Sequence, residues 1–254
     1  MNETVLIGAG GCMRELAWQI QEQNRRLEQA RTQGQAVYPE QTEEQKREGQ
    51  PERTEEQEQV VQQQIWHILG YVDRERPADG CGVMADGQQI PYLGDDTFLL
   101  ERKQETNVFL CVGQPALRKK IAQKLKSNPH LHFPDLILSD TRISRDVRMG
   151  EGCIISMGVQ ISTNVVLGDF VFLNLGSGIC HDGRIGNYVT FGPDVRVAGN
   201  VTVKDDCDLG MASHVIQGIT IGEDTITGAG SVVIRDIPGH CTVAGVPAAV
   251  IKER

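Results

Sequence analysis

Residues 143–190, divided into blocks of six, read ISRDVR-MGEGCI-ISMGVQ-ISTNVV-LGDFVF-LNLGSG-ICHDGR-IGNYVT. Each block begins with an aliphatic residue or methionine, and its fifth residue is small or β-branched. The spacing continues without insertion to residue 237, and fifteen of the sixteen residues at the first position are apolar. A six-residue period fits neither an amphipathic helix nor a simple meander.

Such a period is typical of a chain that turns a corner after every block and directs the first and fifth residues inward. Three flat faces close one triangular coil, so sixteen blocks fill roughly five coils. The sequence therefore predicts a parallel β-helix over residues 141–254, and its resemblance to the known hexapeptide-repeat proteins implies that the helix is left-handed. A loop at residues 243–248, VAGVPA, follows the last repeat.

The first half of the chain has no six-residue period and shows a different pattern of apolar residues. Apolar runs at residues 4–7, 65–72 and 108–112 predict buried strands. The glycine-rich turn 8–11 precedes a helix expected from Arg14, and Pro115 opens a second helix expected to reach Lys126. Strand, glycine turn, helix and strand predict an α/β Rossmann-like domain over residues 1–140.

A Gln/Glu-rich insertion interrupts this domain at residues 21–64, where 23 of 44 residues are Gln or Glu. These residues are good helix formers, which favours a long solvated helix or helical pair with a loop near residues 33–51. The same stretch has little apolar surface to offset the entropy of ordering, so disorder is the alternative.

The bulk composition restricts the partners. A net charge of −9 and a pI near 5.2 argue against nucleic acid or an anionic membrane surface. The seven cysteines are scattered without a CxxC pair, which is typical of reduced thiols in a reducing compartment. The beginning of the sequence lacks the pattern of a signal peptide, so we expect a cytoplasmic protein.

His181, in the motif Cys180-His181-Asp182, comes two residues after the inward Ile179, so its side chain is not needed in the core. Together with the turn 5–11, Tyr71-Val72-Asp73, residues 93–96 and the terminal AGVPA, this motif makes the chain resemble the sialic acid O-acetyltransferase and UDP-bacillosamine N-acetyltransferase family. The resemblance implies a homotrimer that uses acetyl-CoA. It also implies that His181 is the general base and that Asp182 orients the ring or raises its basicity. An imidazole suits removal of a proton from an attacking amine or hydroxyl.

The resemblance also implies four contacts to acetyl-CoA, at Thr190, Gly199, Met211 and Ala229. Thr190 departs from the bacillosamine enzymes, which have histidine there. A zinc site of the γ-carbonic anhydrase type needs three convergent histidines, whereas only His181 and His214 point outward from the repeats, so no metal is expected. Because Cys180 and His181 are neighbours on a strand, their side chains are expected to point apart, which favours direct acetyl transfer over an acyl-enzyme.

The turn after the first strand is the expected acceptor site. Backbone amides at Gly10, Gly11 and Cys12 open a helix, where they can hold a phosphate or sugar hydroxyls. Asp73 and Gly113 end the neighbouring strands and form the other expected walls. The turn is not a full GxGxxG, so a nucleotide-linked or free sugar is favoured over NAD(P), with a purely structural turn as the alternative.

These observations predict an enzyme that transfers the acetyl group of acetyl-CoA to an amine or hydroxyl of a sugar or nucleotide-linked sugar. The rival prediction is a non-catalytic sugar-nucleotide-binding or regulatory trimer on the same fold, suggested by Cys12, Met13 and Thr190. A nucleotidyltransferase is excluded because no basic GxGxR-like phosphate loop occurs near the N-terminus. The acceptor and the choice between N- and O-acetylation stay open.

Overall fold

The computed structural model describes residues 2–33, 64–77 and 82–254. The N-terminal half forms a six-stranded sheet in the order β3-β4-β2-β1-β5-β6, parallel except for the β3–β4 hairpin. The Rossmann-like prediction holds for the three expected strands, and β3, β4 and β6 are additions to it. The strands are β1 (Glu3–Ile7), β2 (His67–Val72), β3 (Gly82–Ala85), β4 (Gln88–Gly94), β5 (Thr106–Leu110) and β6 (Leu131–His132).

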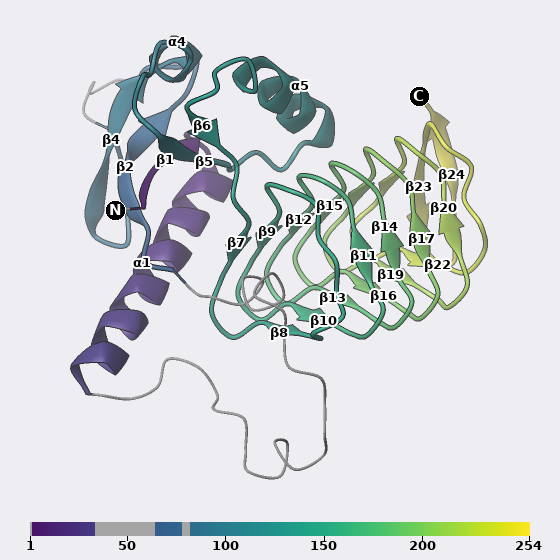
Figure 1. Ribbon diagram of the computed structural model, residues 1–254. Helices are drawn as coiled ribbons and strands as arrows, with labels where there is room; N and C mark the ends of the chain where they lie inside the picture. The colour runs from purple at the N-terminus through teal and green to yellow at the C-terminus, as the bar shows by residue number, and fades with distance from the viewer. Residues whose placement is uncertain (1, 34–63, 78–81) are drawn as a thin grey trace.

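Helices cover both faces of this sheet (Figure 1). Helix α1 (Gly11–Thr32) packs on one face, and α4 (Asp96–Leu100) and α5 (Pro115–Leu125) pack on the other. Helix α1 begins three residues before the expected Arg14 and continues into the Gln/Glu-rich insertion, as the helical interpretation predicted for that part. The expected loop near residues 33–51 lies almost wholly outside the described residues.

The C-terminal half is the predicted left-handed parallel β-helix, in which each strand pairs with the strand eighteen residues later. We call its first face the docking face: β7 (Leu136–Ile137), β9 (Ile154–Ile155), β12 (Phe172–Leu173), β15 (Thr190–Phe191), β18 (Asp208–Leu209) and β21 (Ile226–Thr227). The second face holds β8 (Arg142–Ile143), β10 (Gln160–Ile161), β13 (Gly178–Ile179), β16 (Arg196–Val197), β19 (His214–Val215) and β22 (Val232–Val233). The third face holds β11 (Val166–Leu167), β14 (Arg184–Ile185), β17 (Thr202–Val203) and β20 (Thr220–Ile221).

The inward positions of the repeat are the core of the prism. All sixteen fifth-position residues are buried, and fourteen of the sixteen first-position residues are buried, with Ile143 and Met149 partly so at the open end. Asn and Asp tolerate the left-handed backbone that the corners require, and Asn164 and Asp182 adopt it with φ values of 55° and 62°. The same six-residue repeat thus supplies the inward residues of the core and the residues that form the corners.

Both ends of the β-helix depart from the expected bounds. Strand β7 begins before the boundary expected at residue 140, because Ile137 already occupies the inward phase and pairs with Ile155. At the other end Ile221 pairs with Ile237, only sixteen residues later, so the last coil is shorter. An antiparallel hairpin, β23 (Cys241–Gly245) and β24 (Ala248–Glu253), then extends the docking-face sheet.

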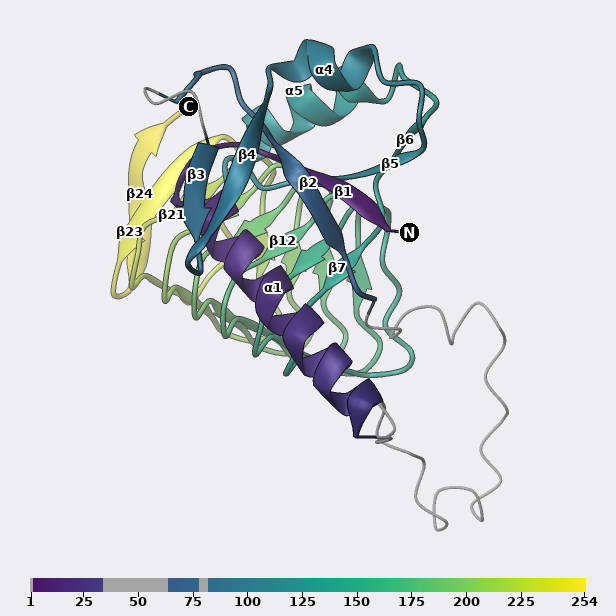
Figure 2. The same ribbon diagram turned by 90° about the vertical axis from the view of Figure 1, so that its left-hand side faces the viewer.

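The N-terminal domain sits on the docking face, and α1 crosses it (Figure 2). Leu16 and Ile20 of α1 share one apolar cluster with Leu136, Ile154 and Phe172, whose side chains point outward from the first three docking-face strands. Because two apolar surfaces are removed from water together, the domains are packed as one body. Strands β18 and β21 continue the docking face beyond this apolar cluster.

Candidate active site

His181 lies at the corner between β13 and β14, where the chain passes from the second face to the third. We call this corner of the prism the distal edge; it comprises residues 162–165, 180–183 and 198–201. In a triangular coil the edge between two faces lies opposite the remaining face. The distal edge is therefore on the side of the prism away from the docking face and its N-terminal domain.

The imidazole of His181 is largely exposed and forms a pair with the following carboxylate. Its Nδ1 lies 2.8 Å from Oδ2 of Asp182. The hydrogen bond from His181, and a second one from Asn164, hold the pKa of Asp182 below its usual value. An ionised carboxylate at this distance selects the tautomer with the proton on Nδ1, so Nε2 is left free to accept a proton.

Gly199 lies directly beneath this imidazole, one coil further along the distal edge. A Cβ atom at residue 199 would lie 2.4 Å from both Cε1 and Nε2 of His181. The backbone N–H of Asn200 also donates to the His181 carbonyl at 2.8 Å. Glycine at 199 thus leaves the space that the ring occupies. Cys180 precedes His181 at the same edge and is exposed.

The other three residues expected to contact acetyl-CoA lie elsewhere in the single chain. Met211 and Ala229 are exposed, one coil apart, at the edge between the docking and second faces. Thr190 is on the docking face and is buried, with 6% exposure. Within one chain these three therefore do not share an edge with His181 and Gly199, and the cofactor contacts stay predictions.

Thr190 takes part in a junction that the sequence analysis did not predict. Its Oγ1 donates to the Gly113 carbonyl at 2.5 Å and accepts from Arg118 at 2.9 Å. Arg118 is 1% exposed, and its guanidinium also donates to carbonyl groups of both domains. These acceptors are Val112, Gly113, Phe170, Tyr188 and Val189.

Burial of the guanidinium lowers the pKa of Arg118 to about 10, so it is still a cation at neutral pH. The burial of Arg118 can be predicted in part from the sequence, because its spacing places it on the same face of α5 as Pro115, Ala122 and Leu125, which are also buried. A charged residue on an otherwise apolar helix face needs internal acceptors. The sequence does not say which carbonyl groups those are.

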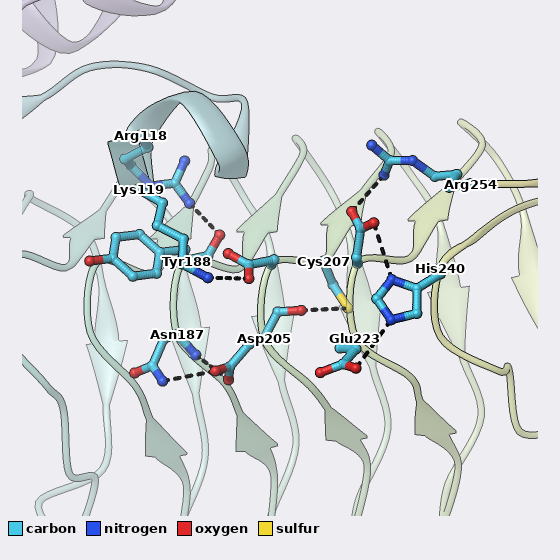
Figure 3. Close-up of polar contacts among 11 residues, drawn as sticks. Arg118, Lys119, Asn187, Tyr188, Asp205, Cys207, Glu223, His240 and Arg254 are labelled. Atoms are coloured by element: carbon cyan, nitrogen blue, oxygen red, sulfur yellow. Dashed lines mark hydrogen bonds and ion pairs between the residues drawn. The ribbon is translucent and has the colours of Figure 1, made fainter. Parts of the chain in front are cut away.

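A neighbouring cation of α5, Lys119, makes further contacts at this junction. Lys119 lies 5.6 Å above the ring of Tyr188 (Figure 3) and pairs with Asp206 at 2.5 Å. The Tyr188 ring also stacks on that of Phe170. Further along the same edge, His240 contacts Glu223 and Asp224. The contacts of Lys119 join the two domains, and those of His240 hold the C-terminal segment to the last complete coil. Both sets lie at a different edge from His181.

The expected acceptor residues cluster at the carboxyl ends of the N-terminal strands. Gly10 caps α1, and Gly8 donates its N–H to the Val72 carbonyl at 2.9 Å. Cys12 opens the helix and is partly buried, which raises the pKa of its thiol to about 11. It is therefore a neutral packing group at physiological pH.

A cavity of 230 Å³ lies beside this turn, between the strand ends and α5. Asp73 is part of its wall, where Oδ1 accepts the N–H of Glu75 at 2.9 Å. Gly10, Gly11, Cys12 and Gly113 are not among the residues that line it. The lining residues are Ile7, Gly8, Val72, Asp73, Arg74, Glu75, Asp96, Val112, Leu117 and Ile121.

Two features are absent from the described part of the chain. No group of three or more His, Cys, Asp or Glu side chains there is arranged to hold a metal ion. Of the helices described, none has both the length and the apolar character to cross a bilayer.

No protein-family profile matches the chain. Among curated relatives, a tetrahydropyridine-dicarboxylate N-acetyltransferase of Enterococcus faecalis is 41% identical over 56 residues, and a serine acetyltransferase of Bacillus subtilis is 42% identical over 52. Each match spans only about a quarter of the relative's length, 24% in both cases.

The likeness to solved structures extends over the whole chain. PerB of Caulobacter crescentus, solved with CoA and GDP-perosamine, is 29% identical over 98% of this chain and 97% of its own, with a TM-score of 0.72. Two further structures of that N-acetyltransferase have one histidine replaced by alanine or asparagine. The PglB acetyltransferase domain of Neisseria gonorrhoeae, solved with acetyl coenzyme A, shares the fold at 21% identity and a TM-score of 0.73.

The uninterrupted repeat, the α/β domain docked on the β-helix and these likenesses lead to one conclusion. Over its whole length the chain is similar to PerB, and it has the fold of the PglB acetyltransferase domain, in which an α/β domain is joined to a hexapeptide-repeat β-helix.

Proposed function

We propose that this protein transfers the acetyl group of acetyl-CoA to an amino group of a nucleotide-linked sugar. The observation that carries the proposal is the exposed His181–Asp182 pair, whose free Nε2 stands on an edge of a hexapeptide β-helix. The choice of an amine is supported by PerB, which was solved with an amino sugar nucleotide and CoA and is 29% identical.

In this mechanism Nε2 of His181 accepts a proton from the acceptor nitrogen as that nitrogen attacks the thioester carbonyl carbon. The tetrahedral intermediate collapses, the carbon–sulfur bond breaks, and the CoA thiolate takes the proton from the imidazolium. The products are an amide and CoA, and the imidazole returns to its starting state. Asp182 stays ionised throughout and stabilises the imidazolium, because its pKa is held low by two hydrogen bonds.

The complete site is proposed to combine two copies of the chain in a homotrimer. His181 is on the distal edge, whereas the Asp73 cavity belongs to the domain on the opposite, docking face. A sugar held in that cavity is therefore separated from His181 of its own chain by the width of the prism. A neighbouring copy can bring its distal edge to the cavity, as cyclic symmetry allows for three identical subunits.

The acetyl-CoA arm is proposed to lie along the β-helix between neighbouring copies. Gly199, Met211 and Ala229 would then contribute backbone groups, which do not depend on the side chain. Asp73 is proposed to be the hydrogen-bond acceptor for a sugar or ribose hydroxyl in the cavity. The expected contacts from Gly10, Gly11, Cys12 and Gly113, which lie beside the cavity and do not line it, stay predictions. Free cysteines in the described structure are consistent with the cytoplasm as the site of action.

The proposal is tested by measuring release of CoA thiol from acetyl-CoA with a panel of nucleotide-linked amino sugars, and by detecting the acetylated product by mass spectrometry. His181→Ala is expected to lower kcat on the order of 10²–10⁴-fold, because general base catalysis is lost. Binding of a nucleotide sugar without thiol release by either protein would instead support the non-catalytic alternative. Turnover only with hydroxyl sugars would correct the acceptor class.

A further inference from the structure

We propose that Asn164 is a positioning residue for the base, acting on His181 through Asp182; the proposal rests on the proposed function and adds a residue to it. The Nδ2 group of Asn164 donates to Oδ1 of Asp182 at 2.6 Å, and Oδ2 of the same carboxylate faces Nδ1 of His181 at 2.8 Å. The three side chains therefore form a continuous chain of hydrogen bonds at the distal edge. Asn164 and Asp182 occupy the same corner position on successive coils.

Asn164 is itself held in place by a residue of the preceding coil. Its backbone N–H donates to Oδ2 of Asp146, one coil earlier, at 2.8 Å. Asp146 also accepts hydrogen bonds from the hydroxyls of Ser144, at 2.7 Å, and Thr163, at 2.5 Å. These donors lower the pKa of Asp146 to about 2, so the carboxylate stays ionised and the arrangement does not change across the physiological pH range.

The carbonyl of Asn164 is fixed as well, because Arg184 donates to it at 2.6 Å. Within the described residues, the hydrogen bonds given above for this corner involve four titratable or charged groups: Asp146, His181, Asp182 and Arg184. Arg145 and Cys180 lie at the same corner. Arg184 bonds to backbone carbonyls and not to the Asp182 carboxylate. The charge of Arg184 also lowers the pKa of Asp182, but the group hydrogen-bonded to Oδ1 is the neutral amide of Asn164, which leaves Oδ2 for the imidazole.

This arrangement matters because the side chains are exposed. Asp182 is one short side chain beside water, and without a second anchor its carboxylate can rotate away from Nδ1. A free imidazole in water favours the tautomer with the proton on Nε2, in which Nε2 has no lone pair to accept the proton of the acceptor nitrogen. By holding Asp182 in place, Asn164 keeps the proton on Nδ1 and the lone pair on Nε2.

The chain contains a matched control residue. Asn200 is at the same corner position on the other side of Asp182, is exposed, and has φ of 57° against 55° for Asn164. Within the described residues its side chain makes no hydrogen bond. Alanine at either position introduces the same left-handed backbone cost, so only Asn164→Ala removes a contact to Asp182.

The experiment compares Asn164→Ala, Asn200→Ala and Asp182→Asn in the full-length protein. The His181 tautomer is measured without substrate, from the ¹⁵N shifts of its ring nitrogens, with His181→Ala to assign the signals. Asn164→Ala is expected to move the population from Nδ1–H towards Nε2–H, as Asp182→Asn does, and Asn200→Ala to leave it unchanged. Because no turnover is needed, this readout is independent of the proposed reaction.

In the acetyl-transfer assay, Asn164→Ala is expected to lower kcat about tenfold with little change in the KM for acetyl-CoA, which is less than the loss expected for His181→Ala. Asn164→Asp is expected to lower kcat as well, because an ionised Asp cannot donate to Asp182. An unchanged tautomer in Asn164→Ala, or equal effects of Asn164→Ala and Asn200→Ala, would overturn the proposal. If no acetyl transfer is found with any variant, the tautomer measurement alone decides it.

Discussion

The imidazole of His181 and the Cα of Gly199 occupy adjacent coils so closely that a Cβ at residue 199 would lie 2.4 Å from Nε2. Gly199→Ala is therefore expected to displace the ring and to lower kcat by roughly 10-fold to 100-fold, because a base moved by about 1 Å is no longer aligned. The melting temperature is expected to change little, since the ring is exposed and free to move. In a His181→Ala background the same substitution should have no further effect on kcat, and an additive effect would contradict this explanation.

Hybrid trimers test the two-copy site. We expect a mixture of His181→Ala and an inactive acceptor-site variant to regain activity when both are unfolded and refolded together. With random assembly about a quarter of the sites would combine an intact His181 with an intact cavity. No activity above the sum of the separate variants would show that one chain supplies both parts.

Asp73 is expected to act on the acceptor alone. Its carboxylate lines the cavity at the strand ends and bonds there to the Glu75 N–H. Asp73→Ala should raise the KM for the nucleotide sugar about tenfold or more, consistent with the loss of a hydrogen bond to a charged group. The KM for acetyl-CoA serves as the internal control, and a parallel rise in both values would contradict a dedicated acceptor role.

Thr190 is expected to stabilise the domain junction. Thr190→Val removes one hydrogen bond to Gly113 and one from Arg118, and should lower the free energy of unfolding by about 1–2 kcal/mol. Arg118→Met should cost more, roughly 3 kcal/mol, because several buried carbonyl groups lose their donor. Denaturant unfolding measures both. A Thr190→Val protein of unchanged stability but raised KM for acetyl-CoA would favour a cofactor contact instead.

Asp135 gives the protein a pH-dependent stability. Burial raises the pKa of this carboxyl to about 6, although its Oδ1 accepts the N–H of Cys153 at 2.8 Å. The folded state thus binds a proton more tightly than the unfolded state, whose pKa is about 3.9. The contribution of this group to stability is fully present below about pH 4 and is lost as the pH rises to about 6. Asp135→Asn should increase the free energy of unfolding at pH 8 by at most about 3 kcal/mol and leave it unchanged at pH 4. The melting temperatures of the two proteins at these pH values measure this difference.

The sequence by itself determined the β-helix and the exposure of its candidate base. The six-residue period leaves one way to bury an aliphatic residue and a small residue in every block, so core and corner positions followed by counting. His181, two residues after the inward Ile179, was outward for the same reason. Helix α5 was likewise confirmed at its first residue, Pro115. These features depend on neighbours within one repeat or one helical turn, and a sequence pattern reports such local relations.

Only the tertiary structure decided which distant groups meet. Arg118 reaches Thr190 across 72 positions of sequence, and no local pattern specifies that pairing. The placement of His181 opposite the docking face, the space that Gly199 leaves for its ring and the amide of Asn164 against Asp182 depend on how coils stack eighteen residues apart. The period predicts that coils stack, but the contacts that position the base come from side-chain directions at the corners, which the fold sets once the chain has closed.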